Sequence, residues 1–287
     1  MKTIAVSAAL SFLVLASTSA FASDNADTEP SIDGLHIYSA FGLRAIPLGA
    51  KLDLNAGYRL GLSDSDSVLL KDTYIEAGVT TISSPSSFWG GAYIEALPVA
   101  VLKLRATAQS MTHFGTFGYL HLPTDPDQSD WSLDALDKPI SSGTPGQGYV
   151  LEGAATLQAK FGNFVAMVPA KYSYVSMDVD RAYYETNFDF LLEPTDQVWQ
   201  IEPTLGYVFV MKEHDSWVLT GFRWQHAETV KSALSRDMPT LLGMWKLPGK
   251  PTGAEMKLVG LGGYWLNHTN REDTLYFAAQ LAADWRF

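Results

Sequence analysis

Hydrophobic and polar residues alternate along most of the chain after residue 32. The clearest run lies between Lys51 and Leu62, where Leu, Leu, Ala, Tyr, Leu and Leu occupy every second position and Lys, Asp, Asn, Gly, Arg and Gly occupy the positions between them. Side chains of a β-strand point alternately to opposite faces, so this period predicts a strand with one apolar and one polar face.

The same alternation recurs in many further runs, which are separated by short turn sequences such as residues 84–87 and Gly162-Asn163. Pro169 and Pro203 fall inside two of these runs and predict a bulge or kink there, because proline cannot donate a ladder hydrogen bond. With 51–62 included, the sequence predicts twelve strands, or ten if 240–247 and one neighbour are loops. The further runs are 35–45, 73–81, 88–96, 102–108, 149–161, 164–176, 199–211, 217–226, 240–247, 256–266 and 275–287.

The length of the runs separates two all-β architectures. Strands of a soluble periplasmic β-sandwich average about 5 to 6 residues, whereas strands that cross a bilayer need about 9 to 11. Most of the runs reach the longer figure. We therefore predict a transmembrane antiparallel up-and-down β-barrel, formed by residues 33–287 as a single domain.

The last run, LYFAAQLAADWRF (275–287), carries a resemblance to a known family. It alternates throughout, and Trp285 and Phe287 fall in its apolar register. It resembles the closing strand of Gram-negative outer-membrane β-barrels. The resemblance implies that the terminal aromatic is the signal read by the barrel-assembly machinery, and that the protein lies in the outer membrane with both termini in the periplasm. The longer connections 120–147, 178–196 and 228–237 would then lie outside the cell.

The first residues are typical of an export signal. Met1-Lys2 gives a short positive region, residues 4–15 are apolar, and Ala20-Phe21-Ala22 is a small-x-small cleavage site. The apolar run is shorter than the ~20 residues that a membrane-spanning helix needs. We predict a signal peptide over 1–22, followed by a polar leader over 23–32.

Composition narrows the set of partners. The chain has no Cys, 20 Lys and Arg, and 31 Asp and Glu, which give a net charge of −11 and exclude a polyanionic partner such as nucleic acid. Only 18% of residues are charged and 12% are aromatic, as a lipid-facing barrel with interfacial Trp and Tyr requires. The expected partners are membrane lipid and lipopolysaccharide, besides the assembly machinery, and the expected state is a monomer.

If the apolar register faces lipid, the opposite register places charged side chains in the lumen, since charges on the lipid face are costly. Rows of this kind can line a narrow pore with a slight preference for anions, or can pair into a plug that closes the barrel. We predict a pore or channel for small polar solutes, with 120–147 as a constriction or lid; the alternative is a closed barrel that binds a partner or stabilises the envelope. The candidate lumen residues are Arg59, Lys103, Arg105, Lys160, Lys171, Arg223, Lys257 and Arg286, with Asp53, Glu76, Glu95, Glu152, Glu202 and Asp284.

The sequence contains few patterns typical of a catalytic or metal-binding site. The His-x-Ser pair of outer-membrane lipid hydrolases is not formed at His36, His113, His226 or His268, and His226-Ala227-Glu228 places a possible base and its orienting carboxylate on one strand face without a serine beside them. The alternate carboxylates of loop 124–131 suit a weak divalent-ion site, but a solvated acidic loop explains them as well. The sequence thus predicts no enzymatic activity, no metal and no cofactor.

Overall fold

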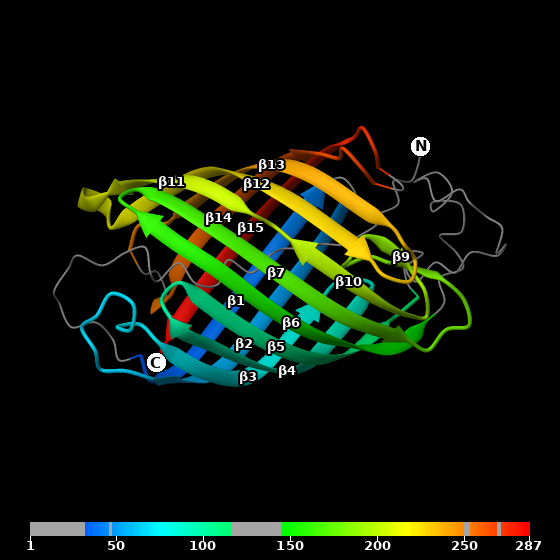
Figure 1. Ribbon diagram of the computed structural model, residues 1–287, viewed down its shortest axis with the longest axis horizontal. Coiled ribbons are helices and arrows are strands. Elements are labelled where there is room, and N and C mark those ends of the chain that lie inside the picture. The colour runs from blue at the N-terminus through cyan, green and yellow to red at the C-terminus, as the bar shows by residue number, and fades with distance from the viewer. Residues whose placement is uncertain (1–31, 46–47, 116–144, 250–252, 269–270) are drawn as a thin grey trace.

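The computed structural model describes residues 32–45, 48–115, 145–249, 253–268 and 271–287. These residues form a closed antiparallel barrel of twelve crossings (Figure 1). The interrupted strand β10–β11 counts as one crossing, because both parts pair with β7 and β12. The strands are β1 (Gly34–Ala45), β2 (Leu48–Gly61), β3 (Tyr74–Ser83), β4 (Ser87–Val99), β5 (Leu102–His113), β6 (Gly146–Phe161), β7 (Phe164–Met177), β10 (Thr195–Ile201), β11 (Thr204–Met211), β12 (Ser216–Thr229), β13 (Ser235–Lys246), β14 (Glu255–Tyr264) and β15 (Leu275–Arg286).

Each crossing pairs with the next along the chain, and β1 pairs with β15 to close the barrel, from His36 opposite Arg286 to Arg44 opposite Ala278. The predicted up-and-down barrel of twelve strands is therefore confirmed. The weakest run, 240–247, lies largely in β13. Pro203 falls in the break between β10 and β11, whereas Pro169 lies within an unbroken β7.

The two ends of the barrel differ in the length of their connections. We call the end where β1 begins and β15 finishes the terminal end; its connections include the tight turns 100–101 and 162–163. The opposite end, the loop end, carries the longest connections, 114–145 and 178–194. Outer-membrane barrels have short periplasmic turns and long extracellular loops, so we expect the loop end to face outward from the cell.

The outward face is apolar. Side chains such as Leu54, Phe41 and Leu281 are 41–48% exposed on it, in the register that the alternation assigned to lipid. Aromatic pairs lie toward both ends: Phe164–Tyr207 near the terminal end, and Tyr172–Trp199 nearer the loop end. Such aromatic belts mark the two membrane interfaces.

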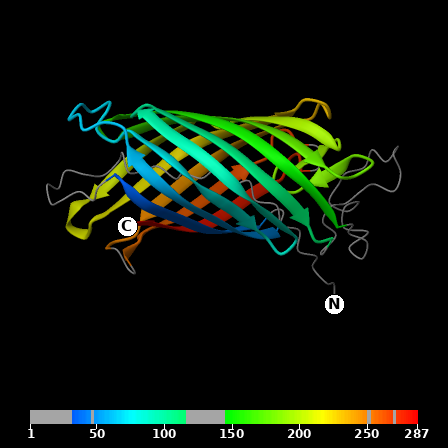
Figure 2. The same cartoon turned by 90° about the horizontal axis from the view of Figure 1, so that it is seen from below.

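A short hairpin of β8 (Tyr183–Glu185) and β9 (Phe190–Leu192) lies at the loop end, opposite the C-terminus (Figures 1 and 2). Its apolar side chains are buried against inward-facing residues of several strands, so the hairpin fills the mouth of the barrel. The cluster comprises Tyr183, Phe188, Phe190 and Leu192 of the hairpin segment with Trp89, Met111, Val150, Val175, Met177, Val198 and Ala227 of the barrel.

A second buried apolar cluster covers the inner wall from β11 to β15 and includes Trp217, Leu242 and Met244. The lumen therefore has a mainly polar wall on β1 to β5 and a more apolar wall on β7 and β11 to β15, where Arg223, Arg236, Lys246 and Lys257 are also buried. No helix among the described residues is long and apolar enough to span a membrane. The predicted signal peptide, nearly all of the polar leader and most of the proposed lid 120–147 lie outside the described residues.

Candidate functional site

A column of polar side chains runs along the inner face of β2. Lys51, Asp53, Asn55 and Arg59 are all inward-facing and no more than 7% exposed. The period of two along the strand puts them in one row, with Gly57 between the last two. Lys51 Nζ and Asp53 Oδ2 form an ion pair of 3.1 Å in the half of β2 that is nearer the loop end.

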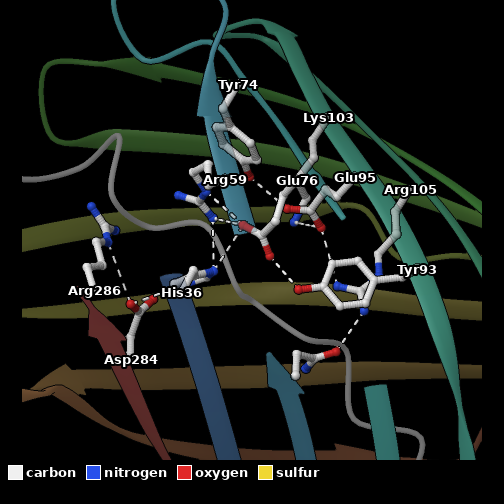
Figure 3. A network of polar contacts seen from close by, with 11 residues as sticks. His36, Arg59, Tyr74, Glu76, Tyr93, Glu95, Lys103, Arg105, Asp284 and Arg286 are labelled. Atoms are coloured by element: carbon white, nitrogen blue, oxygen red, sulfur yellow. Dashed lines mark hydrogen bonds and ion pairs between the residues drawn. The ribbon is translucent and has the colours of Figure 1, made fainter. Parts of the chain in front are cut away.

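At the terminal end this column joins a polar network centred on Glu76 (Figure 3). The Glu76 carboxylate accepts hydrogen bonds from Arg59 Nε at 2.7 Å and from the Tyr93 hydroxyl at 2.5 Å. His36 Nδ1 lies 3.1 Å from the same carboxylate. Strands β1, β2, β3 and β4 are thus tied together through one buried acid.

Glu95 is the second acid of the network. It accepts a hydrogen bond from the Tyr74 hydroxyl at 2.7 Å and pairs with Arg105 at 3.4 Å and Lys103 at 3.7 Å. Arg105 also donates to Asn55 Oδ1 at 2.7 Å, which returns the network to β2. The two guanidinium groups stack on tyrosine rings: Arg59 lies 3.8 Å from the Tyr74 centroid and Arg105 lies 3.9 Å from that of Tyr93.

The network also crosses the seam where the barrel closes. His36 Nε2 lies 3.2 Å from Asp284 Oδ1 on β15, and Asp284 pairs with Arg286 at 3.6 Å. Both ring nitrogens of His36 therefore face carboxylate oxygens, and a doubly protonated ring can donate to both. The first and last strands are therefore joined by the contact between His36 and Asp284 as well as by backbone hydrogen bonds.

The other charges assigned to the lumen lie in separate pairs. Glu152 contacts Lys171 at 3.2 Å, Glu202 contacts Arg223 at 3.6 Å, and Lys257 contacts Glu255 at 2.8 Å. Lys160 lies exposed near the end of β6. Sequence reasoning did not single out His36, Tyr74 and Tyr93, although all three fall in the inward register of their strands.

A separate cluster lies at the loop end around Asp189, at the turn of the hairpin. Its carboxylate contacts Arg271, the Tyr184 hydroxyl and His268 Nε2, the last at 3.2 Å, and Arg236 at 3.9 Å. Burial alone would raise the pKa of Asp189, but Arg271 and His268 outweigh it and hold that pKa well below its usual range. The hairpin thus carries a permanent negative charge into a basic environment.

Glu185, on the same hairpin, is also fully buried. It accepts hydrogen bonds from the Phe188 N–H at 2.7 Å and from Asn187 Nδ2 at 3.3 Å, and His113 Nε2 lies 3.8 Å away. Burial raises the pKa of Glu185 to about 7. This carboxyl is therefore partly protonated near neutral pH, unlike Asp189.

Gly57 leaves space that the terminal-end network uses. A Cβ atom at Gly57 would lie 2.5 Å from the Tyr93 hydroxyl and 3.0 Å from Glu76 Cγ. We expect Gly57→Ala to displace Tyr93 from Glu76 and to destabilise the barrel by about 1–3 kcal/mol. Gly260→Ala is the control, because nothing lies within 4 Å of a Cβ there. Equal urea unfolding midpoints of the two variants would contradict this role of Gly57.

His226 of the His-Ala-Glu motif lies on the outward face near the loop end. Its ring nitrogens face Asp237 at 2.8 Å and Glu228 at 3.2 Å, and Trp224 also donates to Asp237. No serine hydroxyl bonds to this ring in the part of the chain that the structure describes, so no catalytic triad is assembled there. Within the described ranges, no group of three or more His, Asp or Glu side chains is arranged to hold a metal ion, and loop 124–131 lies outside them.

The proposed assembly signal lies at the end of the closing strand. The Phe287 side chain is 71% exposed, and its N–H donates to the Leu35 carbonyl at 3.0 Å. Trp285 lies on the outward face of β15, opposite Ile37. The role of both residues in assembly stays a prediction.

Comparisons with known proteins show that the fold of this chain resembles the folds of solved barrels. No family model and no curated protein matches the chain. The β domain of the Bordetella autotransporter BrkA matches with a TM-score of 0.52 at 11% identity, over 90% of this chain and 100% of that domain. LpxR from Salmonella typhimurium matches with a TM-score of 0.41 at 9% identity, over 87% and 99% of the two chains. OmpT of Vibrio cholerae, an outer-membrane protein, matches with a TM-score of 0.37 at 7% identity, over 88% and 98%.

One of our predictions needs correction here. The exclusion of enzymatic activity rested on histidines that lack a serine two residues later, but His214-Asp215-Ser216 has that spacing and was overlooked. The exclusion was wrong, because the motif is present and because one fold can serve enzymes and non-enzymes alike. The Ser216 hydroxyl donates to the Lys246 carbonyl and accepts a hydrogen bond from Trp245 Nε1, so the structure does not pair it with His214.

Fold, lipid-facing surface and structural neighbours agree on the location of the protein. The likeness at 11% identity concerns the architecture, and no subfamily follows from it. The structural neighbours of the chain are Gram-negative outer-membrane β-barrels, and it is itself an outer-membrane β-barrel.

Proposed function

We propose that the chain is a narrow outer-membrane channel for small polar solutes, closed in the conformation described above. The observation that carries this proposal is the polar column of β2, which extends from Lys51 through Asp53 and Asn55 to Arg59 along the lumen. A water-filled or gated path through a barrel needs such a row, whereas a barrel that is only a scaffold does not.

Energetics also favour a functional role for these charges. Replacement of a buried ion pair by apolar side chains of similar volume is often neutral or stabilising, so stability alone gives little reason to keep charges inside. The opposite wall, lined by residues such as Leu242 and Met244, illustrates that apolar side chains fit this lumen. Charges on the β1–β6 wall are better explained by contact with polar solutes.

The charge balance favours anions slightly. Among the residues that the structure describes, buried Lys and Arg number eight against seven buried Asp and Glu, whereas the whole chain has 20 basic and 31 acidic residues. The interior therefore lacks the acidic excess of the surface and does not repel small anions. Fixed charges at close quarters set the selectivity of a channel.

A closed barrel is the second candidate, and a specific observation favours it. The interior charges are largely paired, as in Arg59–Glu76 and Lys171–Glu152, and the hairpin β8–β9 fills the mouth at the loop end. A sealed lumen of this kind needs no solute. The two candidates differ in what happens when the hairpin is removed.

Planar-bilayer recording of refolded protein tests the proposal. We expect rare or small conductance steps for the wild type and at least several-fold larger ones when residues 178–193 are replaced by a short Gly-Ser linker. Met177 N and Pro194 O are already hydrogen-bonded at 2.8 Å, so a short linker can span the gap. Shortening the exposed loop 63–72 at the terminal end is the control. Correctly folded barrels that stay silent after hairpin deletion would reject the channel and favour the closed barrel.

A further inference from the structure

We propose that the loop end of the lumen contains an anion-binding site, that Asp189 of the hairpin occupies it in this conformation, and that small carboxylate or phosphate anions compete with Asp189 for it. The site is formed by Arg236 of β13 together with His268 and Arg271, and the hairpin supplies its present occupant. This inference concerns ligand binding and stands whether or not the barrel conducts.

The wall of the site is made of buried donors. Arg271 contacts one oxygen of the Asp189 carboxylate, and His268 Nε2 and Arg236 Nη1 approach the other at 3.2 and 3.9 Å. The side chains of Arg271 and Arg236 are only 1% and 5% exposed. Tyr184, which precedes Asp189 on the hairpin, donates to the same carboxylate and accepts a hydrogen bond from Arg271 Nη2 at 2.9 Å.

The charges of this site do not balance. Among the described residues, Asp189 is the acid in ion-pair contact with both guanidinium groups. Glu202 also acts on Arg236, but it is itself paired with Arg223 at 3.6 Å, so positive charge remains in excess. Arg271 Nε is also buried without a hydrogen-bond partner. Buried charges and unpaired donors are costly, and a further anionic oxygen at this place would relieve both costs. The geometry points to a site that prefers an anion with several oxygens.

The ligand class follows from the donors. Guanidinium groups bind planar carboxylates and phosphates through paired N–H donors. The low pKa of Asp189 shows that this environment stabilises a negative charge despite complete burial. The space is that of one carboxylate, so the fitting ligands are small: formate, acetate, inorganic phosphate or the terminal carboxylate or phosphate of a small solute.

The occupant is suited to exchange because a hairpin carries it. Asp189 adopts a left-handed backbone conformation with φ of 57°, which is unfavourable for a residue with a side chain. Apart from the Asp189 cluster, the hairpin is held mainly by the apolar contacts of Phe188, Phe190 and Leu192. An anion that replaces Asp189 breaks the contacts of Asp189 with Arg236, His268 and Arg271, and so allows the hairpin to leave the mouth of the barrel.

Chemical rescue tests the site. Asp189→Ala removes the carboxylate and is expected to lower the thermal midpoint of the refolded barrel by roughly 5–10 °C, as for a broken buried ion pair. About 100 mM formate is expected to restore at least half of this loss, because it binds the vacated site in the folded state. Sodium chloride at equal ionic strength controls for a general salt effect.

Asp196→Ala is the matched control. Asp196 is equally buried at the loop end, but its carboxylate accepts hydrogen bonds from the Lys231 and Ser232 N–H groups, and it has no ion-pair contact with a guanidinium group in the part of the chain described. Formate should not rescue it. Equal rescue of both variants, or none of Asp189→Ala, would overturn the proposal. If Asp189→Ala does not fold, Asp189→Asn keeps the shape of the side chain and serves in the same assay.

A second measurement uses the otherwise wild-type hairpin. The chain has no Cys, so Asn187→Cys gives a single thiol at the half-buried position next to Phe188. Phosphate or acetate is expected to raise its rate of maleimide labelling at least several-fold over the same ionic strength of chloride. In a barrel that also carries Arg271→Met the anions should have no effect. A labelling rate that the anion changes in neither protein would contradict competition with Asp189.

Discussion

Leu54→Arg is expected to destabilise the barrel by about 2–4 kcal/mol, because it places a charge in the hydrocarbon near the bilayer midplane. Leu54 lies in the middle of β2, opposite Ser39 and Thr81, and its side chain is 41% exposed on the outward face. Unfolding by urea in phospholipid vesicles, followed by Trp fluorescence, measures the effect.

Leu60→Arg is the control for depth. Leu60 lies on the same face of the same strand, 49% exposed, but it is next to the last residue of β2 at the terminal end. An arginine there reaches the interface and should cost only about 0–1 kcal/mol. Equal costs at the two positions would mean that this face does not lie against hydrocarbon along its length.

The alternation of residues sufficed to predict the barrel but not the contents of its lumen. Runs such as 51–62 have a period of two over a length that suits a membrane strand, and the twelve predicted crossings correspond to those of the structure. In β13 the pattern fails, because Leu241 faces outward while Leu242 and Met244 face inward. With apolar residues in both registers, alternation cannot assign the faces, and the apolar wall of the lumen stayed hidden.

The hairpin was missed for a different reason. Residues 178–196 were assigned to an external connection, although Tyr183, Phe188 and Leu192 give this segment far more apolar character than an exposed loop needs. That excess was the available signal. Its partners, among them Trp89, Met111 and Arg271, come from distant parts of the chain, so their meeting follows from closure of the barrel rather than from any local pattern.

The sequence likewise could not predict which charged residues pair with one another in the lumen. A period of two places Arg59, Glu76 and Glu95 on inner faces, but which acid meets which base depends on the register between strands. In β2 and β3 Arg59 stands directly opposite Glu76, and in β3 and β4 Glu76 stands opposite Glu95. The two acids are therefore neighbours, and Arg59, Lys103 and Arg105 are needed to neutralise them.

Glu76→Leu is expected to destabilise the barrel by about 3–5 kcal/mol, the range for removal of one partner from a buried ion pair. The change leaves Arg59 buried with its closest acid gone and removes the acceptor for the Tyr93 hydroxyl. The same urea titration in vesicles measures the loss. Glu213→Leu, in the exposed turn before β12, is the control and should change the free energy of unfolding by less than about 0.5 kcal/mol.

The double variant Arg59→Met with Glu76→Leu separates the pair from the isolated charge. If the cost of Glu76→Leu arises from the stranded guanidinium group, removal of that group should recover a large part of it, because apolar replacements of a whole buried pair are often neutral. His36 keeps Asp284 as a partner in both variants, so the seam between β1 and β15 stays charged. Strictly additive losses in the double-mutant cycle would instead mean that Arg59 and Glu76 are not energetically coupled. The terminal-end network would then be a set of independent contacts, and its charges would have to be explained by solutes that reach each of them separately.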